Sequence, residues 1–142
     1  MTSCAYMLDT NIVSDLLKNP RGGVSRKVRH YGIEAICVSS IVASEMRYGA
    51  LKRGSARLVD AIEDVLSRIQ LFDYDDSAAV SYAAMRCGLE RRGSPIGTTD
   101  LFIAAHALSL DLTLVTDNVR EFSRVEGLKV ENWIERDGVD DK

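Results

Sequence analysis

Apolar residues along the chain follow two patterns, short continuous runs and longer stretches with helical spacing. The run at residues 112–115 is typical of a buried strand, whereas residues 58–69 place apolar side chains on one helical face with charges between them. Together the patterns predict strands near residues 4–8, 35–38, 71–72, 112–115 and 128–130, and helices near residues 10–18, 24–31, 58–69, 75–90 and 101–110. A further helix is predicted to begin after Ser39 or Ser40 and to end between Gly49 and Gly54. This alternation predicts an α/β fold with a mainly parallel central sheet flanked by helices.

Helix-breaking residues mark the boundaries between these elements. Asn19-Pro20 ends the first helix, and residues 91–97, which are rich in glycine and proline, predict a loop. Thr98 or Thr99 is predicted to cap the apolar helix that follows. No linker or repeat interrupts the pattern, so residues 1–135 are expected to form a single domain and residues 136–142 a polar tail.

Composition narrows the possible classes of protein. The 142 residues are 46% hydrophobic and 27% charged, and no apolar run reaches the roughly 20 residues that span a bilayer. The first residues lack the features of a secretory signal, so a soluble, cytoplasmic protein without membrane contact is expected. The net charge of -3 provides no overall field that attracts nucleic acid, so such a substrate would need a local basic patch and a metal ion.

Four acidic residues stand where separate chain segments are expected to meet. Asp9 and Asp117 follow predicted strands, while Glu45 and Asp100 lie near the starts of predicted helices. Such positions line the carboxyl edge of a parallel sheet, where open α/β folds place their active sites. The four carboxylates are therefore candidates for a catalytic site.

Each of these acids also has a structural explanation. Asp9 could simply begin a helix, and Asp100 could favour the positive end of one. Asp100 is the most informative, because the helix behind it is so apolar that its first turn must face the interior or a cleft, where a carboxylate needs a partner. A glutamate one turn into a helix is usually solvated, yet the largely apolar neighbours of Glu45 predict that it is partly buried.

Convergence of the acids predicts a metal ion. Several carboxylates close together repel one another unless a divalent cation balances them, and the sequence offers no matching basic cluster beside each acid. Oxygen ligands without cysteine or histidine favour Mg2+ or Mn2+ over zinc. His30 and His106 lie in predicted helices and are interpreted as structural. The three cysteines lack metal-ligand spacing and are interpreted as small buried hydrophobes.

Four motifs in order carry a resemblance to a known family. They are Met7-Leu-Asp9-Thr-Asn11, Ser39-Ser-Ile-Val-Ala-Ser-Glu45, Gly93-Ser-Pro-Ile-Gly-Thr-Thr-Asp100-Leu-Phe-Ile-Ala-Ala and Leu114-Val-Thr-Asp117-Asn118. With this order and spacing the chain resembles a PIN domain, and within that family a VapC-type toxin of a bacterial toxin–antitoxin pair. The likeness runs from about Met7 to Trp133.

The resemblance implies a metal-dependent ribonuclease with a PIN-like fold and an acidic site at the carboxyl edge of the strands. Its first three acids correspond to Asp9, Glu45 and Asp100. The fourth is assigned to Asp117 because this residue is charged, although some members place the last acid one residue later, which here is Asn118.

The expected reaction is hydrolysis of an RNA phosphodiester bond by metal-activated water. Asp9 and Asp100 are expected to bind Mg2+ directly, with Mn2+ as a possible substitute. Glu45 and Asp117 would complete the acidic site or bind a second ion. Asn11 or Thr116 would orient water.

Basic residues near the acids are candidate contacts to the RNA backbone. They are Arg91 and Arg92 at the end of the segment 86–92, together with Arg47, Lys52 and Arg53 after Glu45. Solvated helix ends explain these charges equally well, because phosphate contacts carry no sequence signature. The resemblance also implies a homodimer and a small VapB-type antitoxin that blocks the acidic site, with operator DNA contacted only through the antitoxin.

Two other functions compete with the nuclease. A phosphotransferase could use Asp9 as its nucleophile, but Asn11 stands where such enzymes carry a second aspartate. A non-catalytic RNA-binding module could use the same fold, although it would be expected to have an incomplete set of acids. Detection of an aspartyl-phosphate would favour the phosphotransferase, and a cleavage assay with and without EDTA separates the non-catalytic module from the nuclease.

Overall fold

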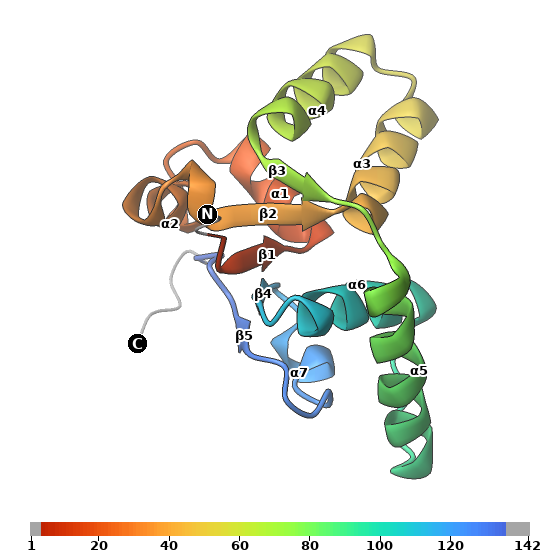
Figure 1. Cartoon of the computed structure of the whole chain (residues 1–142). Coiled ribbons are helices and arrows are strands. Elements are labelled where there is room, and N and C mark those ends of the chain that lie inside the picture. Colours follow the sequence, from red (N-terminus) through yellow and green to blue (C-terminus); the bar gives the residue numbers. More distant parts are fainter. Residues whose placement is uncertain (1–3, 136–142) are drawn as a thin grey trace.

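The computed structural model describes residues 4–135, which form a five-stranded, all-parallel sheet in the order β3-β2-β1-β4-β5 (Figure 1). The strands are β1 (Tyr6–Leu8), β2 (Ile36–Ser39), β3 (Gln70–Phe72), β4 (Thr113–Val115) and β5 (Val130–Glu131). The helices are α1 (Thr10–Lys18), α2 (Gly23–Tyr31), α3 (Ser40–Arg53), α4 (Ala56–Arg68), α5 (Asp76–Arg91), α6 (Thr98–Ser109) and α7 (Val119–Phe122), with a 3-10 turn η1 (Ile33–Ala35). The predicted α/β class with a parallel sheet is confirmed.

The central strand β1 is the point at which the direction of strand addition reverses. From β1 the chain adds β2 and then β3 on one side, and it then crosses to add β4 and β5 on the other side. Met7 pairs with Cys37 on one side, and Leu8 pairs with Val115 on the other. Open α/β sheets bind ligands in the crevice outside the carboxyl ends of the strands at such a switch point. The topology therefore directs attention to the residues that follow β1 and β4.

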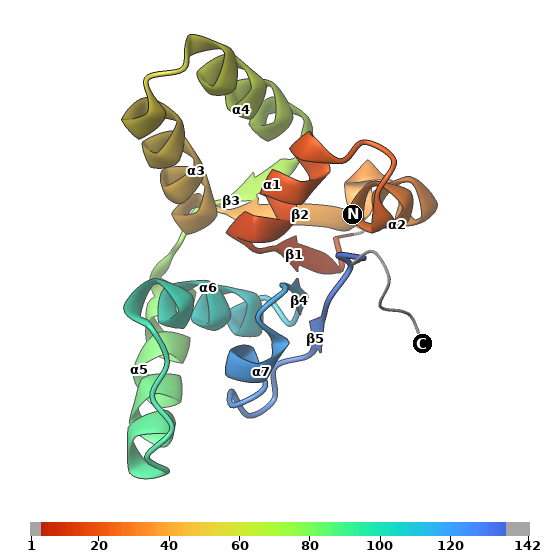
Figure 2. The same ribbon diagram turned by 180° about the vertical axis from the view of Figure 1, so that it is seen from behind.

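Helices cover the sheet and form the core with it. Figures 1 and 2 show α1 and α2 side by side near β1 and β2, the α3–α4 hairpin beyond β3, and α5 packed against α6 on the β4 side. The fully buried side chains include Met7 and Leu8 of β1, Val38 of β2 and Leu114 of β4. Helix α6 is the most buried helix, with Leu101 and residues 103–107 all inside the protein. This burial fixes the position of Asp100, which lies in the first turn of α6.

Helix ends follow the predicted capping residues at α3 but not at α6. Ser39 caps α3 by accepting a hydrogen bond from Ile41 N at 3.0 Å, and Gly54 ends the helix in the left-handed conformation at φ 66°. The predicted cap of α6 by Thr98 or Thr99 is wrong. The N-cap is Gly97, whose carbonyl accepts from Leu101 N at 2.9 Å, and both threonines are already helical. A glycine cap leaves the first turn of α6 open to side chains from other segments.

Several other boundaries differ from the predictions. Helix α5 continues through Arg91, so the loop begins at residue 92, and β5 lies two residues later than expected. The short helix α7 was not predicted, because its four residues are too few to display a helical period. Of the cysteines, Cys37 is buried as expected, but Cys87 is exposed on α5. The predicted tail at residues 136–142 lies outside the described residues, and within residues 4–135 no helix is long and apolar enough to cross a membrane.

Candidate active site

Asp9 lies directly after β1 and caps α1. It is 7% exposed, and Thr10 N donates to its Oδ1 at 2.8 Å. The Thr116 hydroxyl donates to the other oxygen, Oδ2, also at 2.8 Å. Burial raises the pKa of Asp9, and the nearby charges of Asp117 and Glu121 act in the same direction, whereas the two hydrogen bonds lower it. Asp9 is thus a fixed, buried carboxylate at the switch point of the sheet.

Residues that follow β4, the strand paired with β1, contact Asp9 and the start of α1. Asn11 Nδ2 donates to Asp117 Oδ1 at 3.1 Å, which joins the start of α1 to the end of β4. Thr116 Oγ1 accepts from Asn118 N at 3.0 Å while it donates to Asp9. Asp117 therefore lies on the Asn11 side and contributes its charge to Asp9. The side chain of Asn118 instead donates to Glu121 Oε1.

Asp100 and Glu121 form a carboxyl pair. Burial is the largest cause that raises the pKa of Asp100 to about 7, followed by the hydrogen bond and charge of Glu121 and by the charges of Asp9 and Glu45. The same hydrogen bond from Asp100 holds the pKa of Glu121 below its usual range. Two carboxyl groups in contact cannot both ionise freely, so the pair titrates together, and Asp100 holds its proton mainly below about pH 7.

Glu121 is a member of this site that the sequence did not indicate. Gly97 N donates to its Oε2 at 3.0 Å, and Asn118 Nδ2 donates to its Oε1 at 2.6 Å. A Cβ built on Gly97 would lie 3.7 Å from Asp100 Oδ2 and 4.0 Å from Glu121 Oε2, so both carboxylates reach the N-terminus of α6. The spacing Asn118-x-x-Glu121 matches a helix capping box, which would have indicated a structural role. Long-range contacts with Gly97 and Asp100 bring Glu121 into the site.

Glu45 lies at the edge of the cluster. The prediction that it is partly buried is wrong, because the buried positions of α3 are Val42, Ala43, Met46 and Ala50, and Glu45 falls outside that stripe. It is exposed, and it lines a groove between α1 and α3 together with Thr10. Its charge still raises the pKa of Asp100, so it belongs to the electrostatic surroundings of the site.

The candidate RNA contacts Arg91 and Arg92 do not lie among the acidic residues of the site. Arg91 ends α5, which runs away from the carboxyl edge of the sheet (Figure 1). Arg92 Nη2 donates to the Arg124 carbonyl at 2.9 Å. Their role in RNA binding stays a prediction. Neither histidine lies among the acids: His106 is buried against Ser39, and His30 is exposed beside Tyr31.

The donor set suits a hard divalent cation. All acids of the cluster offer oxygen, and the raised pKa of Asp100 beside Glu121 marks a concentration of negative charge that a cation would balance. As they stand, no three histidine, cysteine, aspartate or glutamate side chains of residues 4–135 lie close enough together to hold one ion. Asp9 and Asp100 are the residues expected to hold it, with Glu45, Asp117 or Glu121 nearby.

Comparison with known proteins agrees with the fold. The PIN domain family model matches residues 6–128, and these residues include Asp9, Glu45, Asp100, Asp117 and Glu121. The chain belongs to the PIN domain family. Within it the chain belongs with the VapC proteins, since it is 44% identical over 131 residues to Ribonuclease VapC2 of Haemophilus influenzae, covering 91% of this chain and 98% of that protein.

Other VapC proteins show the same relationship. The chain is 37% identical over 129 residues to the tRNA(fMet)-specific endonuclease VapC of Salmonella typhimurium, covering 90% of this chain and 97% of that protein. The crystal structure of DNA-bound VapBC from Salmonella typhimurium superposes with a TM-score of 0.85 at 37% identity, covering 92% and 98% of the two chains. VapBC2 from Rickettsia felis, bound to a promoter DNA fragment, gives a TM-score of 0.82 at 34% identity, covering 91% and 98%. The predicted VapC-type PIN fold is confirmed.

Proposed function

We propose that the protein is a Mg2+-dependent endoribonuclease that acts as the toxin of a toxin–antitoxin pair. The observation that carries the proposal is the carboxyl pair of Asp100 and Glu121 beside buried Asp9, at the switch point of a PIN domain. Such crowding of carboxylates destabilises a fold unless it serves to bind a cation. Membership of the VapC proteins, which include named ribonucleases, supports RNA as the substrate.

The side chains of this site would act by orientation and charge. Asp9 would be held in one orientation by Thr10 N and by the Thr116 hydroxyl, so its ligand geometry is set before metal binds. Asn11 would hold Asp117 in the same way. A bound Mg2+ supplies a nucleophilic hydroxide at neutral pH and stabilises the leaving oxygen of the phosphodiester. Asn11 or Thr116 would orient water near the scissile phosphate.

The two alternative functions, a phosphotransferase and a non-catalytic RNA-binding module, receive less support from the structure. A phosphotransferase would use Asp9 as its nucleophile, yet Asn11 stands where such enzymes carry a second aspartate, and Asn11 Nδ2 donates to Asp117. A non-catalytic RNA-binding module would not need a carboxyl pair at the switch point of the sheet. A cleavage assay with and without EDTA distinguishes the nuclease from a non-catalytic module, and detection of an aspartyl-phosphate on Asp9 would favour the phosphotransferase.

The similar structures support a VapB-type antitoxin as the partner of this protein. Those of Salmonella typhimurium and Rickettsia felis are VapBC complexes. A homodimer remains a proposal, and Tyr48 and Leu51 on α3, 61% and 71% exposed, are the kind of apolar surface it would cover. A solution mass near twice 15.7 kDa by light scattering would support the dimer.

The test of the proposed activity is cleavage of single-stranded or looped RNA by the purified protein. We expect cleavage with Mg2+ or Mn2+, loss of cleavage in EDTA, and recovery when Mg2+ is restored. Asp100→Asn should reduce the rate by about 100-fold or more, since it removes a charge that holds the cation. Asp111→Asn, at an exposed position with φ 56° that asparagine also tolerates, is the matched control. Full activity after exhaustive chelation would contradict the proposal.

A further inference from the structure

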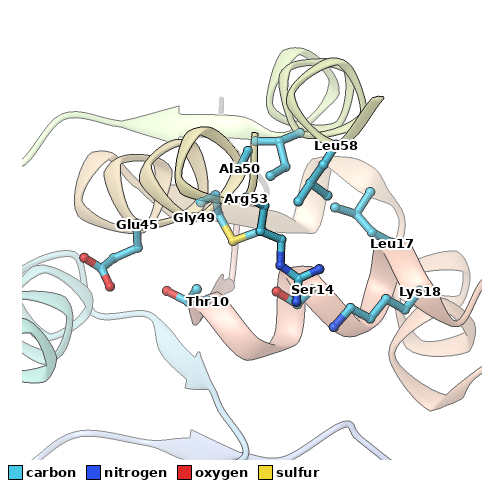
Figure 3. Close-up of a pocket in the computed structure, with 11 residues that line it drawn as sticks. Thr10, Ser14, Leu17, Lys18, Glu45, Gly49, Ala50, Arg53 and Leu58 are labelled. Atoms are coloured by element: carbon cyan, nitrogen blue, oxygen red, sulfur yellow. The ribbon is translucent and has the colours of Figure 1, made fainter. Parts of the chain in front are cut away.

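A groove leaves the acidic site between α1 and α3. Along α1 it is lined by Leu17 and by Thr10, Ser14 and Lys18, which follow one another at intervals of four residues. Four residues of helix advance by about 6 Å and return to the same face, so these side chains form a line that starts next to Asp9 and leads away from it. Figure 3 shows this line of two hydroxyls followed by an ammonium group. The groove has a volume of about 220 Å³.

The opposite wall, on α3, has the same spacing. Glu45, Gly49 and Arg53 line the groove, so a carboxylate stands at the end near the acids and a guanidinium stands at the far end. Figure 3 shows Arg53 reaching from α3 across the groove toward Ser14, with Lys18 pointing to the same place. Two cations thus converge at the end of the groove that is remote from the acids.

These two cations have no anionic partner in the described part of the chain. Ion pairs form at four arginines, namely Arg26, Arg47, Arg68 and Arg86. Among residues 4–135 neither Lys18 nor Arg53 forms one, although like charges repel and each would gain from a carboxylate neighbour. A mobile or bound anion between them would remove this repulsion.

Gly49 leaves space where a side chain would be tolerated. A Cβ built on it would meet nothing within 4 Å, so packing gives no reason for a glycine in the middle of α3. Glycine at such a position weakens a helix relative to alanine. Its effect is to keep the groove wide between Glu45 and Arg53.

We infer that this groove binds the RNA strand on one side of the cleaved bond, with a backbone phosphate held between Lys18 and Arg53. The inference rests on the proposed function, because a strand whose phosphodiester lies at Asp9 must continue past Thr10. Phosphates recur at every nucleotide and suit paired cations, while the apolar floor at Met46, Leu58 and Ile62 offers a surface for a base. The RNA path therefore follows α1, away from Arg91 and Arg92.

The test is binding of a fluorescein-labelled single-stranded RNA of mixed sequence, measured by anisotropy in EDTA at several salt concentrations. Lys18→Gln and Arg53→Gln should each raise Kd by about tenfold and lower the slope of log Kd against log salt by about 0.7, as expected for one lost phosphate contact. Lys129→Gln removes the same charge just before β5, at the opposite edge of the sheet, and should change Kd by less than about twofold. Gly49→Leu should weaken RNA binding without lowering Tm.

Other outcomes would overturn the inference. Equal effects of Lys18→Gln and Lys129→Gln, or normal RNA binding by Gly49→Leu, would remove the groove from the RNA path. If Lys18→Gln and Arg53→Gln kept the RNA affinity of the parent but lost affinity for a synthetic peptide rich in leucine and aspartate, the groove would be assigned to a protein partner. Cleavage by the parent protein, assayed separately with Mg2+, tests the proposed function itself, so the two failures are distinguishable.

Discussion

His106 links the two helices that carry Asp100 and Glu45. Its Nδ1 lies 2.8 Å from Ser39 Oγ, which also accepts from Ile41 N at the start of α3. Burial is the main cause that lowers the pKa of His106 below 6.5, although the charges of Asp73 and Asp75 oppose it. A neutral imidazole that accepts from the Ser39 hydroxyl satisfies both groups. The histidine therefore has a structural function, because it connects α6 to the start of α3.

The depressed pKa of His106 predicts a loss of stability in acid. The unfolded chain takes up a proton at its ordinary pKa of 6.5, while folded His106 stays neutral, so the free energy of unfolding falls as pH decreases below about 6.5. Buried carboxyls with raised pKa values act in the opposite direction, so the contribution of the histidine is read as a difference between variants. His106→Gln should flatten the fall between pH 7 and pH 5 in urea unfolding experiments.

His30 provides the matched control for this prediction, because it is exposed and is the only other histidine of the chain. His30→Gln should retain the pH dependence of the parent protein. Equal slopes for both variants would show that His106 takes up its proton as readily in the folded state as in the unfolded chain.

The sequence predicted candidate site residues where the local apolar pattern fixes the position of the residue. It did not predict residues whose position depends on contacts with distant parts of the chain. Asp9 and Asp100 were found because each adjoins a strongly apolar strand or helix, whose burial fixes the residue beside it. Glu121 was missed because its place depends on Gly97 N, which is 24 residues away. The same limit affected Glu45, since apolar neighbours in sequence do not reveal which face of α3 is buried.

Two helical glycines are expected to respond in opposite ways to an added methyl group. Gly49→Ala in α3 should stabilise the protein by about 0.5–1 kcal/mol, because the new Cβ meets nothing within 4 Å and alanine loses less backbone entropy on folding. Gly23→Ala in α2 should destabilise it by about 1–3 kcal/mol, because its Cβ would lie 2.5 Å from the Trp133 carbonyl oxygen. Urea unfolding of both variants measures the two effects.

The result for Gly23 depends on whether the segment after β5 can move. If Gly23→Ala were as stable as the parent, the approach of Trp133 to α2 would have to be looser than the structure indicates. A destabilised Gly49→Ala would show that α3 has a neighbour across the groove that the isolated chain does not display.

Among the elements, long periodic helices and apolar strands were the predictable part of the fold. Helix α1 matches its predicted range of residues 10–18, since Asp9 and Asn19-Pro20 mark both ends. Helix α6 begins three residues earlier than predicted, at Thr98 and not at Leu101, because Gly97 caps it where a threonine was expected. The order of the strands could not be derived from pattern alone, since it depends on which strand the long segment after β3 rejoins.

At the scale of the whole molecule, the switch between β1 and β4 brings together acids that are more than 100 residues apart in the chain. The hydrogen bonds from Asn11 to Asp117 and from Thr116 to Asp9 close this junction. If the assembled site degrades RNA in cells, expression without a cognate antitoxin should arrest bacterial growth, and Asp100→Asn should permit growth at the same protein level. Growth curves after induction, with protein levels compared by immunoblot, measure this.

Co-expression of the cognate VapB-type antitoxin should restore growth of cells that carry the parent protein. Normal growth with abundant, catalytically active protein would argue against a toxin while leaving the nuclease intact.

The most direct test of the metal site is thermal unfolding of the parent protein and Asp100→Asn at pH 8, with and without Mg2+. The pKa of Asp100 is raised from 3.8 to about 7, so its ionisation costs more in the folded protein than in the unfolded chain, and the cost is fully present above pH 7. Without metal, Asp100→Asn should therefore be as stable as the parent or more stable, by about 1 kcal/mol or more. Mg2+ should raise the Tm of the parent more than that of the variant. A markedly unstable Asp100→Asn, with equal responses of both proteins to Mg2+, would show that Asp100 only anchors the start of α6.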